Sequence, residues 1–264
     1  MQVLAPSVDL RAFYERIDSA PERVLMLDYD GTLAPFRIDP SEAVPYPGVV
    51  QALDEIAQGG MTRVVVVSGR PAEELPSLLA LAQPPEIWGA HGRERLLPDG
   101  RLVIEELDAD ARRALAAAAD LTRAFIPKGA RIEQKRGSVA LHWRGLPPVV
   151  GASLEAEAKA AWSSIAARGV LEILSFDAGL ELRARGCTKE DAVKSVLSET
   201  GEESAIAYLG DDITDEDAFR AVKKRGLAVL VRAELRETQA DLWLRPPAEL
   251  LAFMLRWRVG KRPD

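Results

Sequence analysis

Two aspartates, Asp28 and Asp30, follow directly after the apolar run Val24–Leu27. The run is typical of a buried parallel strand, and Gly31 predicts a tight turn after it. Open α/β sheets bind their ligands at the carboxyl edge, where both acids would then lie. Such a pair suits phosphoryl transfer, because one carboxylate can attack phosphorus while the other donates and accepts the proton of the leaving group. Taken alone, the pattern also fits a turn with two solvated acids.

A second candidate site follows the apolar run Thr62–Val67, which ends in Ser68, Gly69 and Arg70. A serine hydroxyl and neighbouring backbone N–H groups at the amino terminus of a helix form a natural site for phosphate oxygens. We therefore expect a helix over Pro71–Leu81, with Ser68 and Gly69 at its mouth. By itself, Ser68 fits equally well as an ordinary helix cap.

An acidic cluster follows the apolar run Ser204–Leu209, in the segment Gly210–Asp217. Four aspartates and one glutamate in this segment repel one another unless a cation is present. Oxygen ligands select a hard ion, so the cluster predicts Mg²⁺. Asp211 and Asp212 are the main candidates, since the later acids of the segment also favour a helix amino terminus.

Lys189 opens an expected helix over Lys189–Thr200 and supplies a positive charge. A lysine at this place can neutralise both an attacking carboxylate and a transferring phosphoryl group. A single lysine on a helix is most often solvated. The interpretation therefore depends on the ordered set of motifs and not on Lys189 alone.

The motifs need a parallel sheet to bring them together, and the chain alternates strands and helices both before residue 105 and after residue 184. Further elements are expected at Ser7–Ile17, Pro47–Gln58, Glu86–Trp88, a hairpin across Pro98-Asp99-Gly100, Glu216–Lys224, Leu227–Val231, Asp241–Leu244 and Pro247–Arg256. This alternation predicts a Rossmann-like α/β core with a parallel sheet.

Residues 105–184 have a different pattern. The expected order is a helix, a hairpin, a second helix and a second hairpin, at Asp108–Phe125, Arg131–Lys135 with Ser138–Arg144, Ala152–Ala167, and Val170–Phe176 with Leu180–Arg185. This order is typical of an α+β unit with an antiparallel sheet. We therefore predict an inserted domain at 105–184 within a discontinuous core formed by 1–104 and 185–264.

Composition and charge narrow the class of protein. The chain has 264 residues, of which 47% are hydrophobic and 28% charged, as in ordinary globular proteins. Its net charge of -7 argues against nucleic acid or an anionic membrane as a partner. The single cysteine, Cys187, excludes an intramolecular disulfide. No signal peptide or membrane span is evident, so the expectation is a cytoplasmic protein, as a monomer or weak oligomer.

The ordered motifs resemble those of the haloacid dehalogenase (HAD) superfamily of phosphatases. Longer strings resemble the trehalose-6-phosphate phosphatases, namely 27–35 (LDYDGTLAP), 89–92 (GAHG), 132–135 (IEQK), 141–144 (LHWR), 181–183 (ELR) and 210–219 (GDDITDEDAF). The similarity extends from about residue 24 to 255. Two positions depart from the family pattern: Ala184 replaces a common proline, and Glu190 replaces a common glycine.

The resemblance implies hydrolysis of trehalose 6-phosphate to trehalose and phosphate. Asp28 would be the nucleophile that becomes an aspartyl phosphate, and Asp30 the general acid and base. The other implied roles are Mg²⁺ binding by Asp28, the Asp30 carbonyl and Asp211, with Asp212 and Asp215 nearby, and phosphate binding by Ser68, Gly69 and Lys189. Related phosphatases of sucrose phosphate or a glycosyl-glycerate phosphate, and a non-hydrolytic sugar-phosphate sensor, stay open as alternatives.

The inserted domain would be a cap that excludes water and reads the sugar. By the same resemblance, its candidate substrate-binding residues are Glu133, Lys135, Glu181 and Arg183, and carboxylates and basic groups also suit the hydroxyls of a disaccharide. Arg70 and His91 are further candidates in the core. His142 is expected to be an ordinary strand residue at the cap surface.

Overall fold

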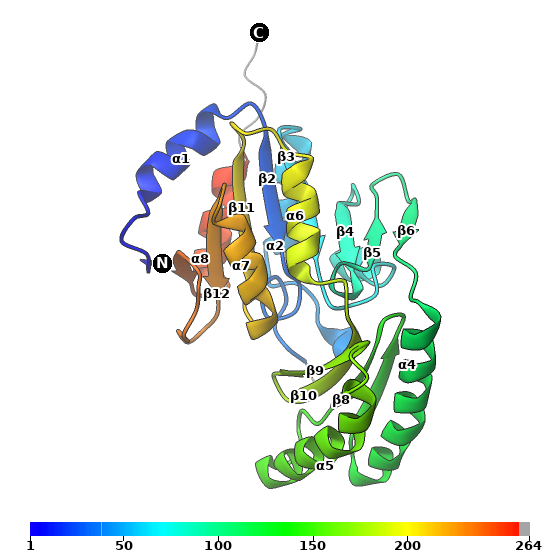
Figure 1. The fold of residues 1–264 in the computed structure, drawn as a ribbon. Helices are drawn as coiled ribbons and strands as arrows, with labels where there is room; N and C mark the ends of the chain where they lie inside the picture. Colours follow the sequence, from blue (N-terminus) through cyan, green and yellow to red (C-terminus); the bar gives the residue numbers. More distant parts are fainter. Residues whose placement is uncertain (38, 259–264) are drawn as a thin grey trace. The chain divides into compact units, whose positions relative to one another are not determined.

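A computed structural model describes residues 1–37 and 39–258 (Figure 1). Contacts separate the chain into two units: the first is Met1–Val103 with the chain from Lys189 onward, and the second is Ile104–Thr188. Each unit has its own apolar core. Among the described residues, none of the helices combines the length and apolar character that a membrane span requires. The functional division into a catalytic core and a cap stays a prediction.

A nine-stranded sheet forms the centre of the first unit. Its strands are β1 (Gln2–Val3), β2 (Arg23–Leu27), β3 (Thr62–Val67), β4 (Glu86–Gly89), β5 (Glu94–Leu96), β6 (Leu102–Ile104), β11 (Ala205–Gly210), β12 (Leu227–Val231) and β13 (Leu242–Leu244). Their order is β1-β13-β12-β11-β2-β3-β4-β5-β6. The six strands from β13 to β4 are parallel, while β1 and β5 are antiparallel to their neighbours. The predicted α/β class is confirmed.

Helices cover both faces of this sheet (Figure 1). They are α1 (Leu10–Ser19), α2 (Val49–Gln58), α3 (Leu75–Leu79), α6 (Lys189–Ser198), α7 (Glu216–Val222) and α8 (Ala248–Met254). Side chains alternate along a strand, so Leu25 and Leu27 of β2 pack with α1, α2 and α8, whereas Val24 and Met26 pack with α6 and α7. Because both faces are covered, β2 is buried throughout and reads as a continuous apolar run.

The helix expected over Pro71–Leu81 is the main error of the sequence analysis in this unit. Only Leu75–Leu79 is α-helical, so no helix begins at Ser68. The intervening backbone has other partners, since Ala72 N–H donates to Glu94 Oε2 at 2.8 Å. These bonds to a distant segment replace those of a helix. The short β1 was not predicted either.

The second unit packs one antiparallel sheet on two helices. Its elements are α4 (Ala109–Thr122), β7 (Arg131–Lys135), β8 (Ser138–His142), α5 (Pro148–Ala166), β9 (Leu171–Phe176) and β10 (Gly179–Ala184). The strand order is β7-β8-β10-β9. Trp162 of α5 is fully buried among the apolar side chains of α4 and the sheet. The predicted order of helices and hairpins is confirmed.

Candidate active site

The acidic residues that follow β2 and β11 meet because these two strands are parallel neighbours. Lys189, the first residue of α6, lies between them. Its Nζ donates to Asp28 Oδ1 and to Asp215 Oδ1, each at 2.7 Å. The side chains of Lys189, Asp28, Asp211 and Asp215 are all buried. Three motifs far apart in the sequence therefore form one buried charged centre.

Asp215 fixes this centre through four hydrogen bonds. Its Oδ1 accepts from Lys189 and, at 2.6 Å, from the Tyr208 hydroxyl. Its Oδ2 accepts from the backbone N–H groups of Asp211 and Asp212, each at 3.0 Å. These bonds occupy the lone-pair sites of the carboxylate, so Asp215 anchors the lysine and the loop. The sequence analysis did not identify Tyr208, because a tyrosine in a buried strand reads as core.

The same centre fits a hard divalent cation. Carboxylate oxygens of Asp28, Asp211 and Asp215 lie within 4.8 Å of one another. Asp211 Oδ1 is buried and has no hydrogen-bond partner within the described ranges. A buried carboxylate oxygen without a partner is costly unless a cation binds it. The oxygen-only set therefore matches the preference of Mg²⁺.

Gly31 and Asp212 lie next to this acidic centre. Gly31 has a φ of 88°, and a Cβ atom there would lie 2.1 Å from Asp211 Oδ2, so the turn after Asp30 requires glycine. Asp212 Oδ1 accepts from the backbone N–H of Ile213 at 2.8 Å, as the cap of a short 3₁₀ helix. Asp215 thus belongs to the buried group with Asp28 and Asp211, whereas Asp212, a main metal candidate from the sequence, caps a turn.

The pKa values of the buried acids show an excess of negative charge among the side chains of this centre. Burial, followed by repulsion from Asp215 and Asp30 and opposed by Lys189, raises the pKa of Asp28 to about 7. Burial and repulsion from Asp28 also raise the pKa of Asp211 well above its usual range. Burial alone would raise the pKa of Asp215 and lower that of Lys189, but their mutual attraction reverses both shifts. One lysine therefore does not compensate three carboxylates.

Asp30 forms a bidentate ion pair with Arg70. Arg70 Nε donates to Asp30 Oδ2 and its Nη2 to Asp30 Oδ1, both at 2.7 Å. The guanidinium also bonds the Pro40 carbonyl at 2.9 Å and lies 5.4 Å from the centre of the Tyr29 ring. Arg70, predicted to bind substrate, thus contacts the predicted general acid.

His91 packs on the loop that contains Ser68 and Gly69. The His91 N–H donates to the Ser68 carbonyl at 3.0 Å. A Cβ atom at Gly69 would lie 2.7 Å from the imidazole ring, so glycine permits this approach. Ala90 and His91 have φ values of 47° and 58°, which non-glycine residues rarely adopt and which cluster at functional sites. The turn thus holds His91 against the predicted phosphate loop.

The four predicted sugar-binding residues share one face of the sheet in the second unit. Glu133 and Glu181 both pair with Ala140, and Lys135 and Arg183 both pair with Ser138. Directly opposed residues of antiparallel strands point to the same side. The other face carries apolar residues such as Leu141 and Leu182, which pack on the helices.

Hydrogen bonds connect the acids of this polar face. His142 Nε2 donates to Glu133 Oε2 at 2.8 Å, and Ser138 Oγ donates to Glu181 Oε1 at 2.6 Å. Lys135 Nζ lies 3.8 Å from Glu133 Oε2 and 3.6 Å from Glu181 Oε1. Burial would raise the pKa of Glu133, but the His142 bond and Lys135 lower it to about 2. His142 is therefore part of the polar cluster and not an ordinary surface residue.

Arg183 lies on the same face and retains an unused donor. Its Nη2 bonds Glu172 Oε1 at 2.8 Å. Its Nε is buried and has no hydrogen-bond partner in the part of the chain that the structure describes. A buried donor of this kind is an available contact for a hydroxyl group.

Sequence alternation along β8 could have indicated Ser138 and His142, since both share the face of Glu133.

The α/β fold of this chain is similar to that of solved HAD-like hydrolases. A solved HAD-like hydrolase from Bacteroides thetaiotaomicron superposes with a TM-score of 0.63 at 16% identity, over 89% of this chain and 99% of that one. The C-terminal domain of C. albicans trehalose-6-phosphate phosphatase superposes with a TM-score of 0.83 at 20% identity, over 99% of this chain and 100% of that domain. At these identities the likeness concerns the fold.

A family model described as trehalose-phosphatase matches residues 26–245. The chain therefore belongs to the trehalose-phosphatase family, which confirms the resemblance seen in its motifs. It is 33% identical over 248 residues to a trehalose-phosphate phosphatase of Mycobacterium marinum, covering 89% of this chain and 61% of that protein. It is 30% identical over 253 residues to a trehalose-phosphatase of Schizosaccharomyces pombe, covering 89% of this chain and 30% of that protein.

Proposed function

We propose that this chain is a Mg²⁺-dependent phosphatase that hydrolyses trehalose 6-phosphate to trehalose and phosphate through an aspartyl phosphate. The observation that carries the proposal is the buried centre in which Lys189 bonds Asp28 and Asp215 beside Asp211. A carboxylate next to a fixed ammonium group can approach a phosphate dianion. Membership of the trehalose-phosphatase family supports the choice of sugar.

In the first half of the reaction, an oxygen of Asp28 attacks phosphorus while the bond from phosphorus to the sugar oxygen breaks. The Asp28 carboxylate is held by Lys189 Nζ at 2.7 Å and by the Thr32 hydroxyl at 3.1 Å. These two donors fix its orientation, and the lysine also reduces repulsion between the carboxylate and the phosphoryl group. Ser68 and the backbone N–H of Gly69 bind the other phosphoryl oxygens.

Asp30 carries out the proton transfer in both halves of the reaction. It protonates the leaving sugar oxygen, and in the second half it removes a proton from the water that attacks the aspartyl phosphate. The bidentate pair with Arg70 suits the ionised form, which is the base of the second half. Proton donation in the first half requires Asp30 to leave at least one of these two bonds.

Mg²⁺, held by Asp28, Asp211 and the Asp30 carbonyl, would neutralise charge on the phosphoryl oxygens. The raised pKa values of Asp28 and Asp211 agree with this placement, because the side chains of the centre do not supply enough positive charge for either carboxylate. The unpaired Asp211 Oδ1 supports it as well.

The polar face of the second unit would bind the sugar hydroxyls. Glu133 and Glu181 are acceptors, while Lys135 and the unused Nε of Arg183 are donors. Hydrogen bonds to charged groups are strong enough to discriminate among sugars. The first unit would therefore carry out the chemistry, and the second would select the sugar.

A screen of the purified protein against sugar phosphates tests the function. We expect phosphate release from trehalose 6-phosphate with Mg²⁺, loss of release with EDTA, and much lower kcat/KM on sucrose phosphate and glucose 6-phosphate. Equal rates on many simple monophosphates would overturn the sugar assignment. Full activity in EDTA would overturn the role of the metal.

Asp30→Asn is expected to lower kcat by about 10²- to 10⁴-fold, because an amide neither protonates the leaving oxygen nor activates water. Steady-state phosphate release measures the effect, with circular dichroism as the control for folding. The conservative Asp30→Glu variant should keep more activity than Asp30→Asn. Turnover that stays at the wild-type level in Asp30→Asn would refute the assigned proton transfer.

Glu133→Gln is expected to raise KM for trehalose 6-phosphate by about tenfold, because the substrate loses a hydrogen bond to a charged group. Hydrolysis of p-nitrophenyl phosphate, which has no sugar, should change less than twofold. Glu157→Gln is the matched control, since Glu157 is an exposed glutamate of the same unit. An equal loss on both substrates would contradict a role in sugar binding.

A further inference from the structure

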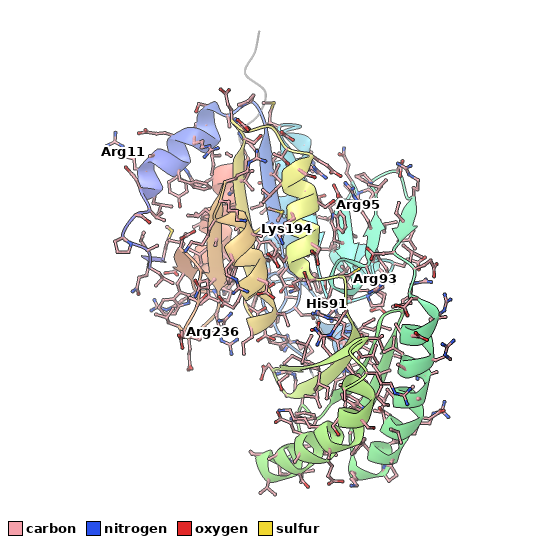
Figure 2. All side chains as sticks on the ribbon, in the orientation of Figure 1. Arg11, His91, Arg93, Arg95, Lys194 and Arg236 are labelled. Carbon is pink, nitrogen blue, oxygen red and sulfur yellow. The ribbon has the colours of Figure 1, made fainter. Side chains whose placement is uncertain are left out.

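The connection between β12 and β13 lies next to the loop that follows β11, because β11 and β12 are parallel neighbours. Arg236, in this connection, lies toward the same end of the sheet as His91 (Figure 2). The guanidinium of Arg236 has four acceptors, namely the carbonyls of Asp211 (3.2 Å), Asp212 (2.7 Å) and Glu237 (2.7 Å) and the carboxylate of Glu216. One side chain thus joins the acidic loop, α7 and its own loop.

Glu216 completes this arrangement. Its Oε1 accepts from Arg236, and its Oε2 accepts from the backbone N–H of Gln239 at 2.7 Å. The side chains of Arg236 and Glu216 are 19% and 16% exposed, so solvent screens their interaction only partly. Glu216 lies in the first turn of α7 and also forms an ion pair with Arg236 of the β12–β13 connection.

These contacts control the orientation of Asp211 through its backbone. The N–H of Asp211 donates to Asp215, and its carbonyl accepts from Arg236 at 3.2 Å and, less closely, from Arg232 at 3.5 Å, so both sides of the residue are held. Its carboxylate has little support of its own, since Oδ1 has no partner in the described parts of the chain and Arg232 approaches Oδ2 only to 3.9 Å. The direction of the carboxylate therefore depends on how its peptide groups are fixed.

We propose that Arg236 is a positioning residue for the divalent cation, acting through the backbone of Asp211 and Asp212, and that Glu216 is its counter-ion. The inference rests on the proposed Mg²⁺ site. Outer partners that orient metal ligands typically contribute about 10- to 100-fold to metal affinity. Arg236 touches neither the substrate nor the reacting atoms in this assignment. Its loss should weaken Mg²⁺ binding and leave the chemical step intact.

The test measures Mg²⁺ binding to the full chain without substrate, by isothermal titration calorimetry, in wild type, Arg236→Gln, Arg236→Lys and Glu216→Gln. We expect Kd for Mg²⁺ to rise about tenfold or more in Arg236→Gln and less in Arg236→Lys, which keeps the positive charge but loses the planar fork of donors. At saturating Mg²⁺, kcat should return to within about threefold of wild type. Arg220→Gln is the matched control, because Arg220 is an exposed arginine on α7 that pairs with Asp217.

A well-folded Arg236→Gln with the wild-type Kd for Mg²⁺ would overturn the inference, as would an equal rise in Arg220→Gln. If Arg236→Gln fails to fold, the other two variants decide: a raised Kd in Arg236→Lys and Glu216→Gln supports the role, and an unchanged Kd in both refutes it. A wild-type protein that binds no Mg²⁺ would refute the proposed metal itself. The wild-type titration thus distinguishes a failure of the role of Arg236 from a failure of the proposed Mg²⁺ site.

Discussion

Asp28→Asn is expected to abolish turnover, with kcat lowered by at least about 10³-fold, and to leave the metal-free protein more stable than wild type at pH 8. The activity is lost because an amide cannot form the acyl phosphate. The stability rises because Asp28 is one of three carboxylates gathered around one lysine, and its charged form is disfavoured by burial and by the neighbouring acids. Catalytic centres often lower stability in this way.

The gain in stability from Asp28→Asn should depend on pH. The folded-state pKa of Asp28, about 7, lies above the ordinary value. Between the two pKa values the folded state retains a proton that the unfolded state has lost, so the free energy of unfolding falls as the pH rises through this range. The stability penalty is absent below about pH 4 and complete above about pH 7. The advantage of Asp28→Asn should follow the same curve.

Urea denaturation in EDTA at pH 4 and at pH 8 measures the difference between the two proteins. Acid quenching of reactions with ³²P-labelled substrate should trap a phosphoprotein in wild type and none in Asp28→Asn. Mg²⁺ should stabilise wild type at pH 8, by about 2.7 kcal/mol at a hundred times Kd. Retained turnover in the variant, or a variant that is less stable than wild type at pH 8 in EDTA, would contradict the assignment.

Lys189→Met is expected to lower both stability and activity strongly. The substitution leaves Asp28 and Asp215 buried without their ammonium partner, next to the buried Asp211. Breaking a buried ion pair in this way typically costs about 3–5 kcal/mol of unfolding free energy. Turnover should fall by about 10³-fold, because the ammonium group also opposes the charge of the transferring phosphoryl group.

A double-mutant cycle separates the two contributions. Adding Asp28→Asn to Lys189→Met removes one of the uncompensated carboxylates, so the double variant should recover part of the lost stability while it stays inactive. Lys194→Met, on the exposed side of α6, is the control for removal of a lysine from the same helix. Thermal denaturation in EDTA and in Mg²⁺ measures each step. A Lys189→Met variant as stable as Lys194→Met would show that the ion pairs in the centre contribute nothing.

Much of the fold could be predicted from local patterns. The strands Thr62–Val67 and Leu227–Val231 have the predicted bounds, because each consists mainly of apolar residues that pack on both faces of the sheet. The prediction of a helix over the whole of Pro71–Leu81 was wrong, because contacts with distant residues decide its structure. Its backbone bonds distant groups such as Glu94, and no local pattern records that choice.

The order of the motifs and the charge imbalance among their acids are properties of the sequence by itself. Short apolar strands that are followed by Asp28, Ser68 and Asp211 can be read directly, because the side-chain period and the turn residues are local. A lysine placed before a helix and an acidic loop after a strand were sufficient to predict phosphoryl chemistry and a metal.

Only the tertiary structure decided which acids of the loop after β11 belong to the buried centre and which do not. Asp212 and Asp215 differ by three positions in one loop, yet one caps a turn in partial exposure and the other is buried and bonds Lys189. The tertiary structure also decided which acids Tyr208, Arg236 and His142 contact, namely Asp215, Glu216 and Glu133 in that order. The reason is physical: a hydrogen bond depends on distance and direction to within a fraction of an ångström, and these are set by packing between segments far apart in the chain.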